Sequence, residues 1–553
     1  MPSPYASFID GAVERILGSN PLELARGSMR GDFVHWDAEN EWPYAVAASY
    51  LMAVAYAYSQ PWSRFHRADD ARQMIEDTIT MLVDVAVDDR WWHRAPRTGD
   101  PNIDRFTLLP LLEAYLFAGE ALSADTRGRL LAKVSGVLAV QRREYGETKD
   151  DAKPYPNMDA YYCLIMLHGS RLTGCEACAA EFERFLEIMA AAQFPDGGWT
   201  YHHGTNECPV YHDINTVLMA RVADLTGDPR AEQMLTRSIP YYPLVVAPTG
   251  QPEYYTDPWW KHSWGAQRSA GPDVVASVTG DARNRAIGEQ LRAQLVGEPV
   301  DWGSQVSPLY LVYADMLWRE VEGADEPPEW GIVEDRNIEG PRGRFPGWSW
   351  AATARYGSDT VVGALSHSPE YGPVTALMAV TAEIMDAEEP EARLRSHALA
   401  ITPPDTTGTT HIERDRATFT CAYQMACYRA VWDHEPFPHR WECRQSWEMT
   451  EQALTGHIEI VSLAEQASPP PCVRIRLGRD LEITETGEGA YRCGPFSVQV
   501  SSSDLPIRAV EPAPSVCYLT TLDAVEIILT TEPQPSYPAG QSFVVDVVVE
   551  HGA

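Results

Sequence analysis

The sequence lacks the features that mark several large classes of protein. No apolar run approaches the length of a bilayer span, and the N-terminal segment has no basic start followed by an apolar stretch, as an export signal would. Acidic residues outnumber basic ones, 78 to 44, and the net charge of −34 argues against nucleic acid or an anionic membrane surface as a partner. We therefore predict a cytoplasmic protein, unless the chain is the mature form of a secreted or periplasmic one.

The sequence also lacks a cysteine framework. Its 10 cysteines are scattered, which is compatible with reduced thiols, so disulfides are not required. Cys175 and Cys178 form one C-x2-C pair, but two further ligands at a spacing suited to structural zinc are missing nearby. We predict no metal site and no cofactor.

The chain does contain enough apolar residues for more than one folded core. Of its 553 residues, 44% are hydrophobic and 22% are charged, which is typical of globular proteins. A chain of this length fits two or three domains. Up to about residue 322, amphipathic stretches with helical spacing recur, as in 43–61 and 105–122, and Ser123 with Asp125 is placed to cap the helix that follows. We predict a helical domain over 1–322.

A short motif repeats at equal intervals in this helical region. It occurs as Leu172-Thr173-Gly174, Leu225-Thr226-Gly227 and Val278-Thr279-Gly280. A unit of roughly 50 residues holds two helices and their loops, so the array is built of helical hairpins. Long loops rich in Trp, Tyr, Pro and Gly, notably 248–265, favour a closed ring whose central cleft they line. An open helical scaffold that binds proteins is the alternative.

The composition changes after this region. Residues 323–345 are rich in Pro, Gly and charge, which is typical of a linker. Beyond them come short alternating or β-branched runs such as 456–464 and 543–550, separated by turn residues. The predicted fold class is therefore α then β: an N-terminal (α/α) toroid of helical hairpins, followed over 346–553 by an antiparallel β-sandwich.

The densest group of polar and aromatic residues lies in segment 193–222. A Gly197-Gly198 turn opens a loop with His202 and His203, and Tyr211 and His212 follow at the start of the next helix. Breaking a glycosidic bond beside a uronate by elimination needs a group that neutralises the carboxylate, a base for the C5 proton and an acid for the leaving oxygen. An amide, a histidine and a tyrosine supply that set.

In these residues the chain resembles the hyaluronate, chondroitin and xanthan lyases. That family has an Asn on its toroid, then a DGS-type turn with a His, then a Tyr nine residues after the His. Here Asp196-Gly197-Gly198 precedes His202, Tyr211 follows at the same spacing, and Asn157 lies upstream on the helix of an earlier hairpin. Arg268 lies where the family has an Arg that supports the Tyr. Alginate and heparin-type lyases of similar build use similar sets, so the resemblance is to a superfamily.

The resemblance implies a polysaccharide lyase that cleaves a uronic-acid-containing glycan by β-elimination and leaves an unsaturated uronate. Asn157 would neutralise the carboxylate, His202 and Tyr211 would handle the C5 proton, and Tyr211, supported by Arg268, would protonate the leaving oxygen. Whether His202 or Tyr211 is the base stays open. The second Gly of the turn replaces the family's Ser, Asn157 is not followed by paired tryptophans, and His203 is an alternative to His202.

Each of these residues also has a structural alternative. Asn157 could cap a helix, Tyr211 could be a core aromatic, and Arg268 could pair with a carboxylate. Equally, His212 rather than His202 could face the cleft.

Other aromatic and basic residues could bind the acidic polysaccharide or oligosaccharide. Indole rings stack on the apolar faces of sugars, with core packing as the alternative, and cations would supply the local basic pocket that the net charge otherwise denies. The predicted substrate-binding residues are Trp91, Trp92, His203, Trp259, Trp260, Lys261 and His262.

Other function classes stay open. An α/α-type glycoside hydrolase would need two carboxylates that flank the bond, for which the candidates are Asp159, Asp196, Glu207 and Asp213. The QFPDGGW segment is similar to the repeat motif of triterpene cyclases, but the acid motif and metal-binding motif of those enzymes are missing. A non-catalytic glycan-binding relative would keep the tryptophans without turnover.

Overall fold

The computed structural model divides the chain into two compact units. Unit 1 consists of Met1–Gln193, Tyr211–Tyr242 and Gly265–Glu326, and unit 2 consists of Phe194–Val210, Pro243–Trp264 and Pro327–Ala553. The structure describes residues 2–19, 42–92, 102–201, 207, 209–247, 269–295, 307–322, 331–355, 360–368, 370–371, 374–382, 400–401, 406–427, 437–466, 470–478, 481–502, 504–512, 524–532 and 534–552.

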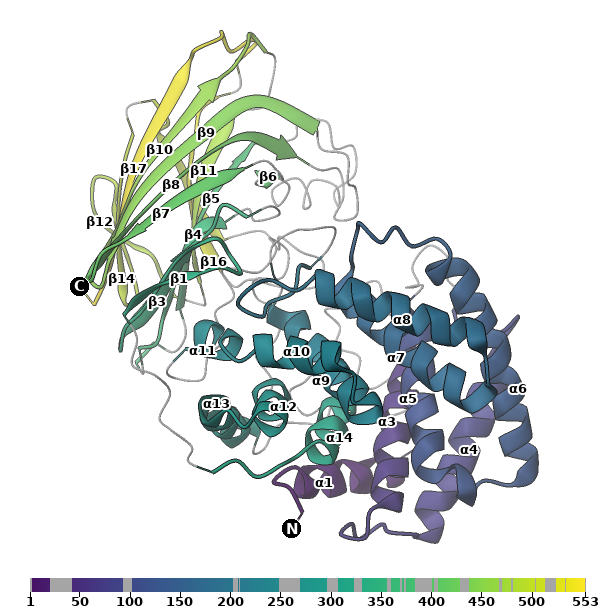
Figure 1. Ribbon diagram of the computed structural model, residues 1–553. Helices are drawn as coiled ribbons and strands as arrows, with labels where there is room; N and C mark the ends of the chain where they lie inside the picture. Colours follow the sequence, from purple (N-terminus) through teal and green to yellow (C-terminus); the bar gives the residue numbers. More distant parts are fainter. Residues whose placement is uncertain are drawn as a thin grey trace. The chain divides into compact units, whose positions relative to one another are not determined.

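Helices follow one another through the first part of the chain (Figure 1). They are α1 (Ala6–Leu17), α3 (Trp42–Ser59), α4 (Asp69–Val85), α5 (Ile103–Ala118), η1 (Gly119–Ala121), α6 (Ala124–Gln141), η2 (Arg142–Gly146), α7 (Pro156–Thr173), α8 (Glu176–Ala191), α9 (Pro209–Thr226), α10 (Pro229–Arg237), α11 (Tyr241–Val245), α12 (Ala270–Thr279), α13 (Ala282–Arg292), η4 (Ala293–Leu295) and α14 (Pro308–Met316). The predicted cap of α6 is confirmed, because Ser123 Oγ accepts the Thr126 N–H at 3.1 Å. Among the described helices, none combines the length and the apolar character that crossing a membrane requires.

The helices alternate between inner and outer positions. Most side chains of α5, α7 and α14 are buried around the whole helix. By contrast, α4, α8 and α13 each bury one face, as an amphipathic helix on the outside of a packed unit does. One buried helix followed by one half-buried helix is the hairpin that the sequence repeat predicted.

The repeated glycines end three successive inner helices. Gly174, Gly227 and Gly280 have φ angles of 69°, 63° and 77° and close α7, α9 and α12. This left-handed conformation favours glycine because other side chains clash there. In each case the preceding threonine hydroxyl donates to a carbonyl four residues back at 2.7 Å. The repeat therefore encodes helix ends, which explains its constant spacing.

A buried carboxylate on α5 connects four inner helices. Glu113 is fully buried, and its Oε1 lies 3.0 Å from Nε2 of His168 on α7. The guanidinium of Arg221 on α9 donates to both Glu113 oxygens at 3.0 Å. The Tyr313 hydroxyl on α14 donates to Glu113 Oε1 at 3.1 Å. A buried charge is tolerated only when such partners surround it. These contacts therefore fix the position of each of the four helices along its own axis.

Two contacts show that α5 and α7 run in the same direction. The rings of Phe106 and Tyr161 meet edge to face with centroids 4.9 Å apart, and Glu113 meets His168 seven residues later in both helices. His168 on α7 and Arg221 on α9 both contact Glu113, and a few residues later Arg171 donates to the Leu225 carbonyl at 2.8 Å, so α9 also runs parallel to α7. The N-terminal ends of these inner helices consequently lie at the same end of unit 1.

The first helices of unit 1 meet the last ones. Ser3 Oγ and the Tyr56 hydroxyl on α3 both donate to Asp315 on α14, the latter at 2.6 Å. The Tyr5 hydroxyl donates to Asp273 on α12 at 2.5 Å. These contacts close the array into a ring, so the predicted toroid is confirmed over the open scaffold.

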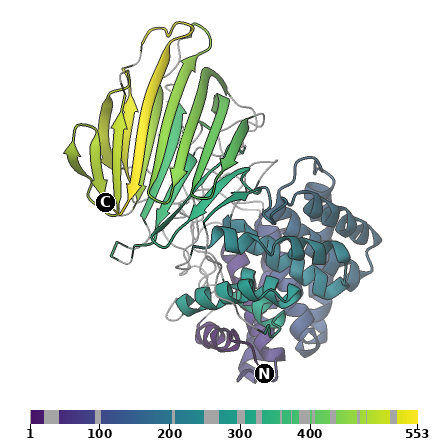
Figure 2. The ribbon, with the colours of Figure 1, turned by 60° about the vertical axis from the view of Figure 1, so that its left-hand side comes forward.

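Unit 2 contains two antiparallel sheets (Figure 2). The strands are β1 (Ile332–Asp335), β2 (Gly340–Arg344), β3 (Trp348–Ala352), β4 (Thr360–Ser366), β5 (Val374–Ala382), β6 (Ala400–Ile401), β7 (Thr407–Ile412), β8 (Arg416–Cys427), β9 (Phe437–Thr450), β10 (Ala453–Ser462), β11 (Pro471–Gly478), β12 (Thr484–Gly487), β13 (Ala490–Cys493), β14 (Phe496–Ser501), β15 (Ile507–Pro512), β16 (Ala524–Thr530) and β17 (Ser542–His551). In the described residues, one sheet has the order β1-β2-β3-β4-β5-β11-β16-β15. The other has the order β12-β13-β14-β17-β10-β9-β8-β6, and β7 also pairs with β8.

The two sheets pack through alternating apolar residues and indole hydrogen bonds. Burial alternates along β10 and β17, so the second sheet has one buried face. On β3 of the first sheet, Trp348 and Trp350 donate through Nε1 to the carbonyls of Glu451 and Thr450, at 2.7 and 2.8 Å. Those carbonyls lie at the end of β9 in the second sheet, and the predicted β-sandwich is confirmed.

Two predicted boundaries differ from the structure. Strands β1 and β2 lie inside 323–345, which was predicted to be a linker. Two of the charges that suggested a linker are buried instead, since Arg342 pairs with Asp335 at 2.8 Å and neither side chain is exposed. Segments Phe194–Val210 and Pro243–Trp264, both predicted to belong to the helical domain, belong to unit 2.

We predict that Glu113→Gln destabilises the protein in a pH-dependent way. Burial raises the pKa of Glu113, but His168 and Arg221 outweigh it and lower this pKa to about 2 from the usual 4.5. A lowered carboxyl pKa contributes stability above the unfolded-state pKa, and this contribution is lost as the pH falls toward 2. Urea unfolding should show wild type about 3 kcal/mol more stable than the variant at pH 7, a difference that shrinks below about pH 4.5.

The exposed Glu120 provides the control, because Glu120→Gln should change the free energy of unfolding by less than about 0.5 kcal/mol. Equal effects of the two variants at pH 7 would contradict the role given to Glu113.

Candidate functional site

Two of the predicted catalytic residues lie in the first turns of inner helices. Asn157 is the second residue of α7 and Tyr211 is the third residue of α9. His168 follows Asn157 by 11 residues and Arg221 follows Tyr211 by 10, and both contact Glu113. At a rise of about 1.5 Å per residue, Asn157 and Tyr211 are each about 15 Å from that carboxylate along the helix axes. The structure thus brings both residues to the same end of unit 1 and to the same level.

Asn157 has an unusual environment for an amide. Its side chain is 4% exposed, and its Oδ1 is buried without a hydrogen-bond partner among the described residues. The N-cap position of α7 belongs to Tyr155, so Asn157 does not cap its helix. Since a buried acceptor without a donor costs about 1–3 kcal/mol, the amide is not there for stability. Tyr211 is half-buried.

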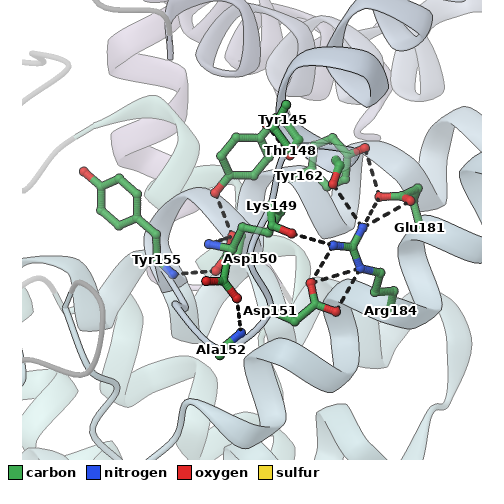
Figure 3. A network of polar contacts seen from close by, with 12 residues as sticks. Tyr145, Thr148, Lys149, Asp150, Asp151, Ala152, Tyr155, Tyr162, Glu181 and Arg184 are labelled. Carbon is green, nitrogen blue, oxygen red and sulfur yellow. Dashed lines mark hydrogen bonds and ion pairs between the residues drawn. The ribbon is translucent and has the colours of Figure 1, made fainter.

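The buried carboxylate of Asp159, two residues further on, holds the chain as it enters α7. Figure 3 labels three of the residues that contact it, Tyr145, Lys149 and Tyr155. Asp159 accepts the Tyr145 hydroxyl and the Tyr155 backbone N–H, both at 2.6 Å. Lys149 Nζ lies 3.0 Å from Asp159 Oδ1, and its side chain is only 8% exposed. Burial raises the pKa of Asp159, while Lys149 and the two hydrogen bonds oppose this shift. These contacts fix the turn that presents Asn157.

Helix α8 holds the other side of the same turn. Arg184 donates through Nε to both Asp151 oxygens at 3.1 Å. It also donates to the carbonyls of Gly146 and Lys149 at 3.0 Å. As Figure 3 shows, its guanidinium points into the segment between η2 and α7. That segment therefore has a defined conformation although it contains no regular element.

The two residues of the predicted sugar-binding pair, Trp91 and Trp92, differ in their exposure. Trp91 has no exposed surface, and its indole N–H donates to the Leu82 carbonyl at 2.8 Å. Asp104 accepts the backbone N–H groups of Trp91 and Trp92 at 2.7 and 3.0 Å. A fully buried ring cannot stack on a sugar, so the binding role predicted for Trp91 is wrong and the core-packing alternative holds. Trp92 is half-buried.

His212 is a core residue of unit 1. Its ring stacks on Tyr241 with centroids 3.4 Å apart, and its side chain is 2% exposed. Burial lowers the pKa of His212 well below its usual value, so the imidazole is neutral at physiological pH. The alternative that His212 faces a cleft is wrong for this reason.

Within unit 2, the segment on both sides of His202 and His203 is bonded to the start of the β-sandwich. Asp196 accepts the backbone and Nε N–H groups of Arg336 at 2.9 Å. The Gly198 N–H donates to Asn337 Oδ1 at 2.9 Å.

On the far side of the two histidines, Glu207 forms a β-bridge with Thr200. The Glu207 carboxylate lies 3.8 Å from the guanidinium of Arg342, and neither side chain is exposed. Both ends of 201–206 are therefore held by the β-sandwich. These partners were not predictable from the sequence, because 335–342 has the composition of a linker.

The remaining predicted site residues lie outside the described residues. They are His202, His203, Trp259, Trp260, Lys261, His262 and Arg268.

The four candidate carboxylates for a glycoside hydrolase all take part in contacts that stabilise the fold. Asp159 pairs with Lys149, Asp196 with Arg336 and Glu207 with Arg342, and Asp213 accepts the Tyr242 hydroxyl at 2.9 Å. Each of the four is buried. None of these four carboxylates is therefore placed as an accessible acid or base.

Together, the ring of helical hairpins and the antiparallel sandwich define the fold of the toroid-plus-sandwich polysaccharide lyases. No protein-family model matches the sequence, and comparison with curated proteins finds no similar sequence. Among solved structures, a chondroitin AC lyase from Streptomyces coelicolor A3 aligns over 100% of this chain and 80% of its own, with a TM-score of 0.56 and 13% identity. A xanthan lyase from Paenibacillus aligns over 100% of this chain and 60% of its own, with a TM-score of 0.53 and 10% identity. The predicted fold is confirmed.

We predict that Asp159→Asn destabilises unit 1 strongly. The substitution leaves the ammonium of Lys149 in a mostly buried place without its counter-charge, which costs about 3 kcal/mol. Urea unfolding followed by circular dichroism measures this loss. The exposed Asp150 lies in the same turn, and Asp150→Asn is the matched control, with an expected change below about 0.5 kcal/mol. Similar losses for both variants would argue against a special role of Asp159.

A second variant tests the connection within unit 2. Asn337→Ala removes the acceptor of the Gly198 N–H, so this amide should exchange with deuterium roughly ten- to a hundredfold faster, as the loss of about 1–3 kcal/mol implies. The exposed Gln452 gives the control variant Gln452→Ala. Unchanged exchange at Gly198 in Asn337→Ala would show that the segment is held by other contacts.

Proposed function

We propose that the protein is a polysaccharide lyase that cleaves a uronic-acid-containing glycan by β-elimination. The shared fold supports an enzyme that acts on glycans. The observation that carries the proposal further is the buried amide of Asn157, which lies at the same end and level of the inner helices as Tyr211. Under this proposal the amide is preorganised for a ligand, which explains why its acceptor has no partner among the described residues.

An asparagine suits the carboxyl group of a uronate for a physical reason. Its amide offers N–H donors and a carbonyl acceptor, so it pairs with a carboxyl group in protonated form through both oxygens. It carries no charge, so the empty site contains no buried ion. Neutralising the carboxylate makes the neighbouring C5 proton more acidic, which is the first requirement for elimination.

The remaining steps move one proton and break one bond. A base removes the C5 proton, the electron pair forms the C4–C5 double bond, and the C4–O bond breaks. Tyr211 donates a proton to the leaving oxygen, in the first turn of α9, where the positive end of the helix dipole favours the negative charge that develops on the phenol oxygen. The roles of His202 as partner base and of Arg268 as support for Tyr211 rest on the resemblance to the lyase family. No step requires a cofactor.

The arrangement of the helices also affects how a negatively charged substrate can bind. An acidic substrate is unexpected for a protein with a net charge of −34. However, the N-terminal ends of α5, α7 and α9 lie at one end of unit 1, and each carries about half a positive charge. Together they attract an anion without any basic side chain. A negatively charged protein can therefore bind a negatively charged glycan at this place.

The test is ultraviolet absorbance of the unsaturated uronate while the full-length protein is incubated with a panel of uronic-acid glycans. Wild type should produce absorbance with at least one glycan. Tyr211→Phe and Asn157→Ala should each lower kcat/KM for that glycan by about 100- to 10,000-fold. Tyr115→Phe removes a half-buried phenol near the opposite end of α5 and should leave the rate unchanged.

Two outcomes would overturn the proposal. New reducing ends without absorbance would show hydrolysis instead of elimination. Full activity of Tyr211→Phe would remove the residue to which the mechanism assigns the leaving-group proton.

A further inference from the structure

The two cysteines of the C-x2-C pair lie in one turn at the start of α8. Cys175 is the N-cap residue and is partly exposed, whereas Cys178, in the first turn, is fully buried. The Sγ of Cys175 accepts the Cys178 backbone N–H at 3.2 Å and the Cys178 thiol at 2.6 Å. The two sulfur atoms therefore already face each other, so that a bond between them needs little movement of the backbone.

The internal repeat shows what position 175 requires. In the two later copies the residue after the repeated glycine is an aspartate, and Asp228 and Asp281 cap α10 and α13. Their carboxylates accept first-turn N–H groups at 2.8 and 2.9 Å. Cys175 occupies the same place and accepts the same kind of hydrogen bond. An anion is favoured there in all three copies, because the helix dipole and the free N–H groups point at it.

The surroundings shift the pKa values of the two thiols in opposite directions. Burial opposes the ionisation of Cys175, but the hydrogen bonds from Cys178 and the positive charge of Arg142 lower the pKa of Cys175 below its usual value. Burial raises the pKa of Cys178 to about 12, and Glu181 acts in the same direction. The accessible sulfur is thus the better nucleophile, and the buried one stays protonated until a bond partner forms beside it.

We infer that Cys175 and Cys178 form a redox-active dithiol that exchanges with low-molecular-weight disulfides such as oxidised glutathione. The Cys175 thiolate attacks one sulfur of the glutathione disulfide, a mixed disulfide forms, and one glutathione thiolate leaves. Cys178 then loses its proton to solvent and attacks Cys175 Sγ, and the second glutathione thiolate leaves. The protein dithiol is oxidised by two electrons, and one glutathione disulfide is reduced to two thiols.

Two other roles fit the pair less well. A disulfide that closes so short a loop constrains the unfolded chain little, so it contributes little stability. A metal site needs more ligands, and the described residues contain no group of three or more His, Cys, Asp or Glu side chains that could hold an ion. The other cysteines whose side chains the structure describes are buried, namely Cys163, Cys421, Cys443, Cys472 and Cys493. Reversible exchange is the role that the exposure of Cys175 supports.

The experiment equilibrates the full-length protein with glutathione buffers of increasing oxidised fraction, followed by acid quenching, alkylation and peptide mass spectrometry. In wild type the peptide that contains both cysteines should lose two hydrogen atoms in mass and escape alkylation. Cys178→Ser should accumulate glutathione on Cys175, because the resolving thiol is missing. Cys175→Ser should form neither product. Cys163→Ala, which removes a buried thiol elsewhere, should behave like wild type.

The variant Cys175→Asp tests whether the loss of exchange reflects lost redox chemistry or lost stability. It restores the capping residue of the other two repeats, so it should melt at or above the temperature of wild type while losing all exchange. The inference is overturned if the wild-type peptide stays fully alkylated in every buffer, or if glutathione in Cys178→Ser is found only on other cysteines. Because no glycan takes part, these results are independent of the proposed lyase activity.

Discussion

The buried carboxylate of Glu113 is the interaction on which the arrangement of the helical unit depends. Removing a charge from water costs several kcal/mol unless partners surround it, and here each partner comes from a different inner helix. A helix that slid along its axis would leave an unpaired ion or phenol. Apolar packing alone tolerates such shifts far better, because it is not directional. The heights of Asn157 and Tyr211 therefore follow from the contacts of His168 and Arg221, about three turns further along the same helices.

A ring of parallel inner helices has an electrostatic consequence. The N-termini of α5, α7 and α9 lie at the same end of unit 1, so partial positive charges accumulate there although the chain as a whole has a net charge of −34. The net charge of a protein therefore says little about the sign of the potential at one site. The negative charge of this chain argues against nucleic acid as a partner, yet it is compatible with an anionic sugar at the helix ends.

Local signals in the sequence predicted the parts of the structure that depend on neighbours in the chain. Helical periodicity, the cap at Ser123 and the repeated glycines are such signals, and each predicted element or helix end was found. The Glu113 network was not predictable in this way, since Arg221 and Tyr313 lie 108 and 200 residues away in sequence. The linker prediction failed for a related reason: Asp335 and Arg342 neutralise each other in the fold, which composition does not record. The binding role predicted for Trp91 was wrong because charged neighbours in the chain do not keep a side chain at the surface: its ring is fully buried and its indole N–H donates to the Leu82 carbonyl.

Helix α8 connects the two sites for which we propose a chemical role. Its first turn holds Cys175 and Cys178, and about two turns later Arg184 holds the segment that leads to Asn157. A disulfide within one helical turn requires no movement of the helix axis, since the sulfur atoms already face each other. The bonds of Arg184 to the carbonyls of Gly146 and Lys149 are therefore compatible with both redox states. It follows that oxidation of Cys175 and Cys178 changes the reactivity of these two thiols. The turn that presents Asn157 keeps its conformation.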